Sequence, residues 1–219
     1  ESVPAPGVRG SDGSSVVAVA FTDIRSSTTI WEAKPDAMRA ALRIHNSVMR
    51  DVMQVFGGYE VKTIGDAFMI AFEELGRGVS FGLRVHEELR KAEWPVGLYD
   101  VPICAVDGPL WGGLTVRIGV NSGTVTVEEN NLTHRMDYFG HTVNVASRLE
   151  SSCTPGAVAV PLGLCEGPWT STSFVGAPEA MSLKGVSEPL MVCCVWPLSL
   201  AGRAQNPLKE AVVMSRDSV

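Results

Sequence analysis

The segment VVAVAFTDIRSST, residues 16–28, gives the strongest local indication of the fold. Its first six residues are apolar and rich in valine, which is typical of a strand buried on both faces. Asp23 follows where this strand would emerge, and three hydroxyl residues then lead into a helical pattern. The start of a helix offers free N–H groups and a positive dipole end, so this turn is suited to holding a phosphate group. Capping of the helix by these same polar residues is the simpler interpretation.

A second segment, YEVKTIGDAFMIAF at residues 59–72, predicts a hairpin of two short strands joined by Gly65-Asp66. Gly-Asp is ordinary turn chemistry. If this hairpin lies beside the first strand, however, Asp66 and Asp23 meet at one edge of the sheet. Two carboxylates around a phosphate ligand repel one another unless divalent cations lie between them, and Mg²⁺ suits such oxygen ligands.

The other periodic segments complete an α+β pattern. Residues 27–56 and 75–93 are helical, with a break expected at Pro35. A further hairpin of residues 114–121 and 124–128, turning at Ser122-Gly123, precedes a helix at residues 142–152 and a final group of short strands. Those strands are expected near residues 157–161, 171–175, 181–184 and 190–196. The order predicts an α/β sandwich whose mixed, mainly antiparallel sheet has a ferredoxin-like βαββαβ core with helices packed on it.

The chain of 219 residues is long enough for one large domain, expected over residues 15–197. Residues 1–14 are expected to form a flexible lead-in, residues 95–113 an irregular insertion, and residues 198–219 a tail without pattern.

Composition excludes several classes of function. Lys and Arg number 18 against 24 Asp and Glu, giving a net charge of −6, which argues against nucleic-acid binding. The apolar runs are far shorter than the roughly 20 residues that cross a bilayer, so no membrane insertion of this segment is expected. Five cysteines without a Cys-x-x-Cys motif favour reduced thiols in the cytoplasm over disulfides or a zinc site.

Four further polar residues are each ambiguous alone. Asn144 and Arg148 lie four apart on one helix face, where they suit a phosphate clamp, although a solvated polar face is the simpler interpretation. Lys62 and Arg117 sit within short apolar strands and are equally compatible with an exposed sheet face.

Taken together, five segments resemble the class III nucleotide cyclase catalytic domain in order and spacing, over residues 16–196. FTDI, KTIGD and NVASR are highly specific in combination, and FTDI-x-SST is most similar to the receptor-type adenylate cyclases of trypanosomatids. The insertion at residues 95–113 falls where those enzymes carry an extra subdomain. The five segments are VVAVAFTDIRSST, YEVKTIGDAFMIAF, LTVRIGVNSG, DYFGHTVNVASRLES and LKGVSEPL.

The resemblance implies a role for each candidate residue. Asp23 and Asp66 match the metal-binding pair, with the backbone carbonyl of Ile24 as a further ligand. Two Mg²⁺ ions per site are implied, for which Mn²⁺ can substitute. The other matches are Ser27, Thr28, Arg117 and Lys184 for the phosphates, Lys62 and Asp137 for the purine, and Asn144 and Arg148 for the ribose and transition state.

The purine pair points to ATP. Adenine offers an acceptor at N1 and a donor at N6, which a Lys donor and an Asp acceptor complement, whereas guanine presents the reverse. The expected reaction is in-line attack of the 3′-hydroxyl on the α-phosphate, giving 3′,5′-cyclic AMP and pyrophosphate. The resemblance also implies a head-to-tail homodimer with sites at its interface. The expected setting is the cytoplasmic part of a larger, membrane-anchored receptor.

Three alternatives stay open from the sequence. A guanylate cyclase is disfavoured by Lys62 and Asp137. A palm-like polymerase or diguanylate cyclase also uses paired carboxylates around a hairpin, but it does not account for the helix carrying Asn144 and Arg148. A catalytically silent nucleotide-binding or dimerisation domain would be favoured by a missing site residue, and every expected position is filled.

Overall fold

The computed structural model describes residues 3–7, 14–186 and 188–207. In this part of the chain one sheet runs in the order β2-β3-β1-β4-β6-β9-β7, with β5 paired to β4 and β8 paired to β9. Every pairing is antiparallel except that of β4 with β6, so the predicted mixed, mainly antiparallel sheet is confirmed. The strands are β1 (Ser14–Ile24), β2 (Tyr59–Ile64), β3 (Ala67–Phe72), β4 (Val116–Glu129), β5 (Met136–Phe139), β6 (Val158–Pro161), β7 (Ser173–Val175), β8 (Glu179–Met181) and β9 (Leu190–Pro197).

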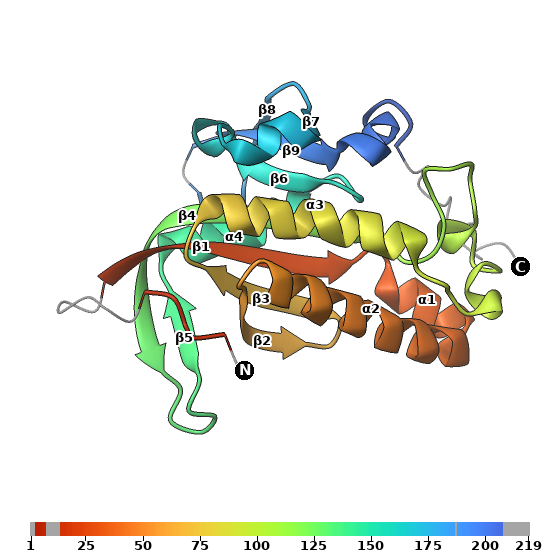
Figure 1. The fold of residues 1–219 in the computed structure, drawn as a ribbon, viewed down its shortest axis with the longest axis horizontal. Coiled ribbons are helices and arrows are strands. Elements are labelled where there is room, and N and C mark those ends of the chain that lie inside the picture. The colour runs from red at the N-terminus through yellow and green to blue at the C-terminus, as the bar shows by residue number, and fades with distance from the viewer. Residues whose placement is uncertain (1–2, 8–13, 187, 208–219) are drawn as a thin grey trace, which may run out of the picture.

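Four α-helices cover the two faces of the sheet. They are α1 (Ser27–Ala33), α2 (Pro35–Val55), α3 (Leu75–Lys91) and α4 (His141–Ser152). Alternate residues of β1 separate two layers of core, because Ala18 and Ala20 pack with α2 and α3 while Val17 and Val19 pack on the side of α4. Helices α2 and α3 accordingly lie in front of the sheet in Figure 1, and α4 lies behind it. The βαββαβ core is therefore present.

In the first half of the chain, local sequence signals correctly predicted the helix break and the β2–β3 hairpin. The helical pattern breaks as predicted, since α1 ends at Ala33 and Pro35 is the first residue of α2. The hairpin of β2 and β3 has the bounds expected from the sequence.

The prediction of a hairpin that turns at Ser122-Gly123 is wrong. Strand β4 runs straight through these residues, which pair with Ala18 and Val17 of β1. A Cβ atom at position 123 would lie 2.8 Å from Thr142 Oγ1. Glycine is present there because α4 packs closely over the strand, not because the chain turns. The true hairpin joins β4 to β5 through residues 130–135, and no sequence pattern predicted β5.

The insertion and part of the tail add to the packed domain. In the insertion, 3₁₀ turns at Val96–Leu98 and Pro102–Cys104 bury apolar side chains. In the expected tail, Leu198–Ala204 forms 3₁₀ turns whose Arg203 guanidinium lies 4.3 Å above the Trp111 ring. Residues 1–2 and 8–13 of the expected lead-in, and residues 208–219 of the tail, lie outside the described residues. Across the described ranges, no helix is both long and apolar enough to cross a membrane.

Candidate active site

Two carboxylates meet at the end of β1. Asp23 is the second-last residue of this strand, and Asp66 occupies the turn between β2 and β3. Asp66 Oδ2 accepts a hydrogen bond of 3.2 Å from the backbone N–H of Ile24, so the hairpin turn contacts the strand end directly. Burial and then the negative charge of Asp66 raise the pKa of Asp23, while Arg117 opposes both effects. The pair therefore forms a site of excess negative charge.

Arg117 links the carboxylates to α4. It pairs with Asp23 across the β1–β4 ladder, and its Nη2 lies 2.8 Å from Asp23 Oδ2. Its Nε lies 3.1 Å from Oε1 of Glu150, a buried residue of α4. Burial raises the pKa of the Glu150 carboxyl, and the Arg117 charge lowers it in part. The sequence patterns did not single out Glu150, because its partner Arg117 comes from β4, which is distant in sequence.

The donor set at the strand end fits a hard divalent cation. Asp23, Asp66 and the backbone carbonyl of Ile24 are all oxygen donors, which Mg²⁺ prefers. Within the described ranges, no group of three or more His, Cys, Asp or Glu side chains could hold a metal ion. Two carboxylates leave most of an octahedral shell for water and substrate phosphate, which is how Mg²⁺ is usually held in phosphoryl-transfer sites.

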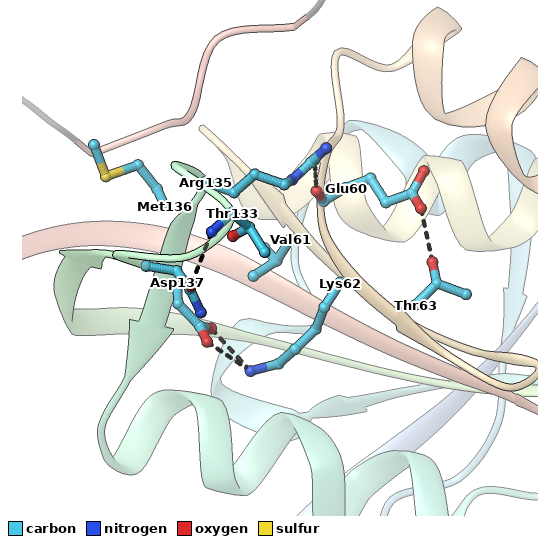
Figure 2. Close-up of a pocket in the computed structure, with 9 residues that line it drawn as sticks. Glu60, Val61, Lys62, Thr63, Thr133, Arg135, Met136 and Asp137 are labelled. Atoms are coloured by element: carbon cyan, nitrogen blue, oxygen red, sulfur yellow. Dashed lines mark hydrogen bonds and ion pairs between the residues drawn. The ribbon is translucent and has the colours of Figure 1, made fainter.

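The expected purine pair lies in a separate cavity. Lys62 comes from β2 and Asp137 from β5, and Lys62 Nζ donates hydrogen bonds of 2.9 and 2.8 Å to the two Asp137 carboxylate oxygens. Figure 2 shows these side chains pointing toward one another. They line a cavity of about 340 Å³, which neither Asp23 nor Asp66 lines. The cavity is lined by Glu60, Val61, Lys62, Thr63, Asn130, Thr133, Arg135, Met136 and Asp137.

One wall of this cavity comes from the loop between β4 and β5. Arg135 donates a hydrogen bond to the Glu60 carbonyl, and its guanidinium lies 5.1 Å above the Tyr59 ring. These contacts fix the loop against β2 beside Lys62. No sequence pattern indicated Arg135, because its contacts depend on β5, which the patterns did not predict.

Helix α4 presents two polar side chains on its outer face. Asn144 is exposed and Arg148 is half-buried, and among the described residues neither side chain has a hydrogen-bond or ion-pair partner. The opposite stripe of α4 packs on the sheet through Val145 and Leu149. At Gly119 of β4, a Cβ atom would lie 2.2 Å from the backbone nitrogen of Glu150, so only glycine admits the helix this close. Asn144 and Arg148 do share a face, as their spacing predicts.

The remaining candidates lie in separate places. Ser27 and Thr28 form the first turn of α1, directly after the left-handed Ser26 with a φ of 53°. Lys184 is exposed in the turn that follows β8. Within the described residues the structure thus groups Asp23, Asp66 and Arg117, groups Lys62 with Asp137, and does not bring Lys184 into contact with either group.

A βαββαβ core with carboxylates at the end of β1 and in the β2–β3 turn suits both nucleotide cyclases and palm-like polymerases, and comparison with known families decides between them. Residues 11–165 match the family described as the adenylate and guanylate cyclase catalytic domain, and the chain belongs to this family.

Named relatives agree with this assignment. The adenylate cyclase of Schizosaccharomyces pombe is 34% identical, and the match covers 88% of this chain and 13% of that protein. Receptor-type adenylate cyclase B of Leishmania donovani is 33% identical and matches 74% of this chain and 14% of that protein. The chain therefore spans only a small part of the length of these relatives.

A solved structure supports the fold as well. An adenylate cyclase of Trypanosoma brucei, studied in its monomeric state, superposes with a TM-score of 0.75 at 30% identity. The match covers 82% of this chain and 87% of that one. The resemblance to trypanosomatid cyclases that the motifs indicated is confirmed.

Proposed function

We propose that the domain, over residues 15–197, is an adenylate cyclase that converts ATP into 3′,5′-cyclic AMP and pyrophosphate. The observation that carries the choice of ATP is the ion pair between Lys62 and Asp137 inside a cavity of about 340 Å³. An ammonium donor and a carboxylate acceptor side by side complement N1 and N6 of adenine. Guanine would place its own donors against Lys62 and its acceptor against Asp137, which leaves hydrogen-bonding groups unpaired at a cost of about 1–3 kcal/mol each.

The metal half of the proposed site consists of Asp23, Asp66 and the Ile24 carbonyl, which would hold two Mg²⁺ ions or Mn²⁺ in their place. When bound, such a pair of cations lowers the pKa of the attacking 3′-hydroxyl and neutralises charge on the phosphates. Arg117, which now neutralises Asp23, is within reach of the same phosphates after the cations take over that role. It supplies positive charge on the side of β4.

The remaining residues bind and orient the nucleotide. Backbone N–H groups at Ser27 and Thr28 donate to the phosphates, and the Lys184 ammonium pairs with the triphosphate. Asn144 holds the ribose so that its 3′-oxygen faces the α-phosphorus. Arg148 donates to the oxygens of the α-phosphate as negative charge accumulates on them, and preorganised donors of this kind lower the barrier directly.

A head-to-tail homodimer would complete each site. Within one subunit, the purine cavity does not include the carboxylate pair, and Arg148 has no partner among the described residues. A two-fold axis that brings the carboxylates of one subunit to the purine cavity and α4 of the other forms two equivalent sites from the same surfaces. The relatives named as receptor-type enzymes support a cytoplasmic position within a larger membrane-anchored receptor.

The test is turnover by the purified domain. With ATP and Mg²⁺, product analysis by mass spectrometry should find cyclic AMP and pyrophosphate in equal amounts, and equal concentrations of GTP should give far less cyclic GMP. A preference for GTP would make the protein a guanylate cyclase. Nucleotide binding with no cyclic product from either substrate, at protein concentrations where dimers are proven, would leave only a silent binding domain.

A further inference from the structure

Strand β9 carries two adjacent cysteines that point to opposite faces of the sheet. Cys193 lies in the core beneath α2 and α3, and Cys194 packs in the cluster on the other side. Each thiol meets a second cysteine there, Cys165 on the first face and Cys153 on the other. The described chain thus holds two thiol pairs placed back to back across one strand.

The pair of Cys153 and Cys194 joins the end of α4 to β9. Cys153 directly follows α4, and its Sγ lies 3.3 Å from the Ala157 carbonyl oxygen. Ala159 of β6, two residues after Ala157, pairs with Cys194 across the β6–β9 ladder. The side chains of Cys153 and Cys194 pack in the same cluster. The backbone therefore holds the sulfurs together without a covalent bond.

Only one member of this pair is accessible. Cys194 is partly exposed and lines a cavity of about 360 Å³, together with Thr154, Glu179 and Trp196. Cys153 lies behind it with 4% of its surface exposed. A small solute can therefore reach the Cys194 sulfur first, and the Cys153 sulfur behind it can react with Cys194 afterwards.

The surroundings of Cys194 favour its thiolate. Hydrogen bonds from the Cys153 thiol and from the backbone and side chain of Thr154 lower the pKa of Cys194 to about 7, against the opposing effect of burial. Burial instead raises the pKa of Cys165 to about 12 and that of Cys104 to about 11. Because the thiolate is the nucleophile, Cys194 is the most reactive of these thiols near neutral pH.

We propose that Cys194 and Cys153 form a redox-active dithiol that hydrogen peroxide oxidises to an intramolecular disulfide and that a small-molecule thiol reduces again. The Cys194 thiolate attacks one peroxide oxygen, so that an S–O bond forms and the O–O bond breaks, and the leaving hydroxide takes up the proton that Cys194 released and becomes water. The Cys153 sulfur then attacks the Cys194 sulfenic acid, forming the S–S bond as the S–O bond breaks. The second hydroxide takes the Cys153 proton and leaves as water, and two electrons have passed from the sulfurs to the peroxide.

Disulfide formation would act on α4. The sulfurs must approach to about 2.05 Å, which draws the end of α4 toward β9. Arg148 lies on α4, five residues before Cys153, so the oxidised domain should turn over more slowly. This consequence for turnover rests on the proposed function, whereas the disulfide itself does not.

The experiment treats the reduced chain with stoichiometric hydrogen peroxide and follows intact mass, peptide linkage and cyclase activity. The wild type should lose the mass of two hydrogen atoms, link the peptides of Cys153 and Cys194, lose activity several-fold and recover it with dithiothreitol. Cys194→Ser should form no such link. Cys193→Ser is the matched control, since the neighbouring residue on the opposite face should leave the reaction unchanged.

Each remaining outcome is decisive. Alkylation of the native wild type by iodoacetamide, which needs no variant, should modify Cys194 first, and preferential modification of Cys165 or Cys104 would overturn the proposal. A link between Cys165 and Cys193, or none at all, would also overturn it. A Cys153–Cys194 disulfide with unchanged turnover would reject the effect on α4. A domain inactive in both redox states would refute the proposed function, and the mass measurement would still decide the dithiol.

Discussion

The carboxylate edge and the outer face of α4 differ in whether their polar side chains have partners within the subunit. At the carboxylate edge, the Arg117 guanidinium lies 2.8 Å from Asp23 and 3.1 Å from Glu150, so one cation offsets part of the charge of two carboxylates within the subunit. On the outer face of α4, Asn144 and Arg148 have no side-chain partner among the described residues. The first group therefore contributes to the stability of the subunit itself, whereas the second is available to a ligand or to another subunit.

The largest expected effect comes from breaking the carboxylate edge. Asp66→Asn should abolish Mg²⁺-dependent formation of cyclic AMP, because a neutral amide cannot hold the cation. The fold should persist, since Asp66 lies in a turn and its bond to the Ile24 N–H can be kept by the amide oxygen. The measurement is turnover with Mg²⁺ and with Mn²⁺, beside a circular dichroism melt. Asp51→Asn, an exposed carboxylate on α2, is the control and should keep wild-type activity.

A smaller effect is expected from the purine cavity. Replacing Lys62 with Glu and Asp137 with Cys should reduce the preference for ATP over GTP by at least about tenfold, since each mismatched hydrogen bond costs about 1–3 kcal/mol. The measurement is kcat/KM for both nucleotides. Lys91→Gln, at an exposed residue at the end of α3, controls for the change of −1 in net charge. Undiminished selectivity in an active double variant would show that this pair does not contact the purine.

The free energy of unfolding should distinguish the carboxylate edge from the outer face of α4. Arg117→Gln should lower the free energy of unfolding by about 1–3 kcal/mol, because it removes the cation that pairs with Asp23 and with the buried Glu150 carboxylate. Arg148→Gln should change it by less than about 0.5 kcal/mol, as expected for a side chain without partners. Urea denaturation at one pH measures both. Equal losses in the two variants would mean that the two regions do not differ in the way described.

A further effect on stability comes from pH. Burial lowers the pKa of His86 to about 3 and that of His45 to about 4, against 6.5 for a free histidine. The unfolded chain therefore binds more protons below pH 6.5, and the free energy of unfolding should fall on acidification toward pH 5. Each histidine contributes at most about 1.4 kcal/mol per pH unit. His86→Gln should flatten this slope in urea titrations at pH 7, 6 and 5, whereas an unchanged slope would contradict its burial as the neutral form.

Sequence patterns predicted what depends on local chemistry and on strand pairing. Pro35 and the Gly65-Asp66 turn act on their immediate neighbours, so the helix break and the hairpin were placed correctly. The convergence of Asp23 with Asp66 followed from placing that hairpin beside β1. Gly123 was misinterpreted because the reason for glycine lies in α4, which is distant in sequence. Glu150 and Arg135 were missed for the same reason, since their partners come from other elements.

In the proposed function, the two regions act together across a two-fold interface. Asp23→Asn and Arg148→Ala should each be nearly inactive as homodimers, because every site then carries one lesion. When the two variants are co-expressed, random pairing makes about half of the dimers mixed, and each mixed dimer has one site with both lesions and one with none. Activity should then recover to about a quarter of that of the wild type. No recovery in proven heterodimers would contradict a site shared between subunits.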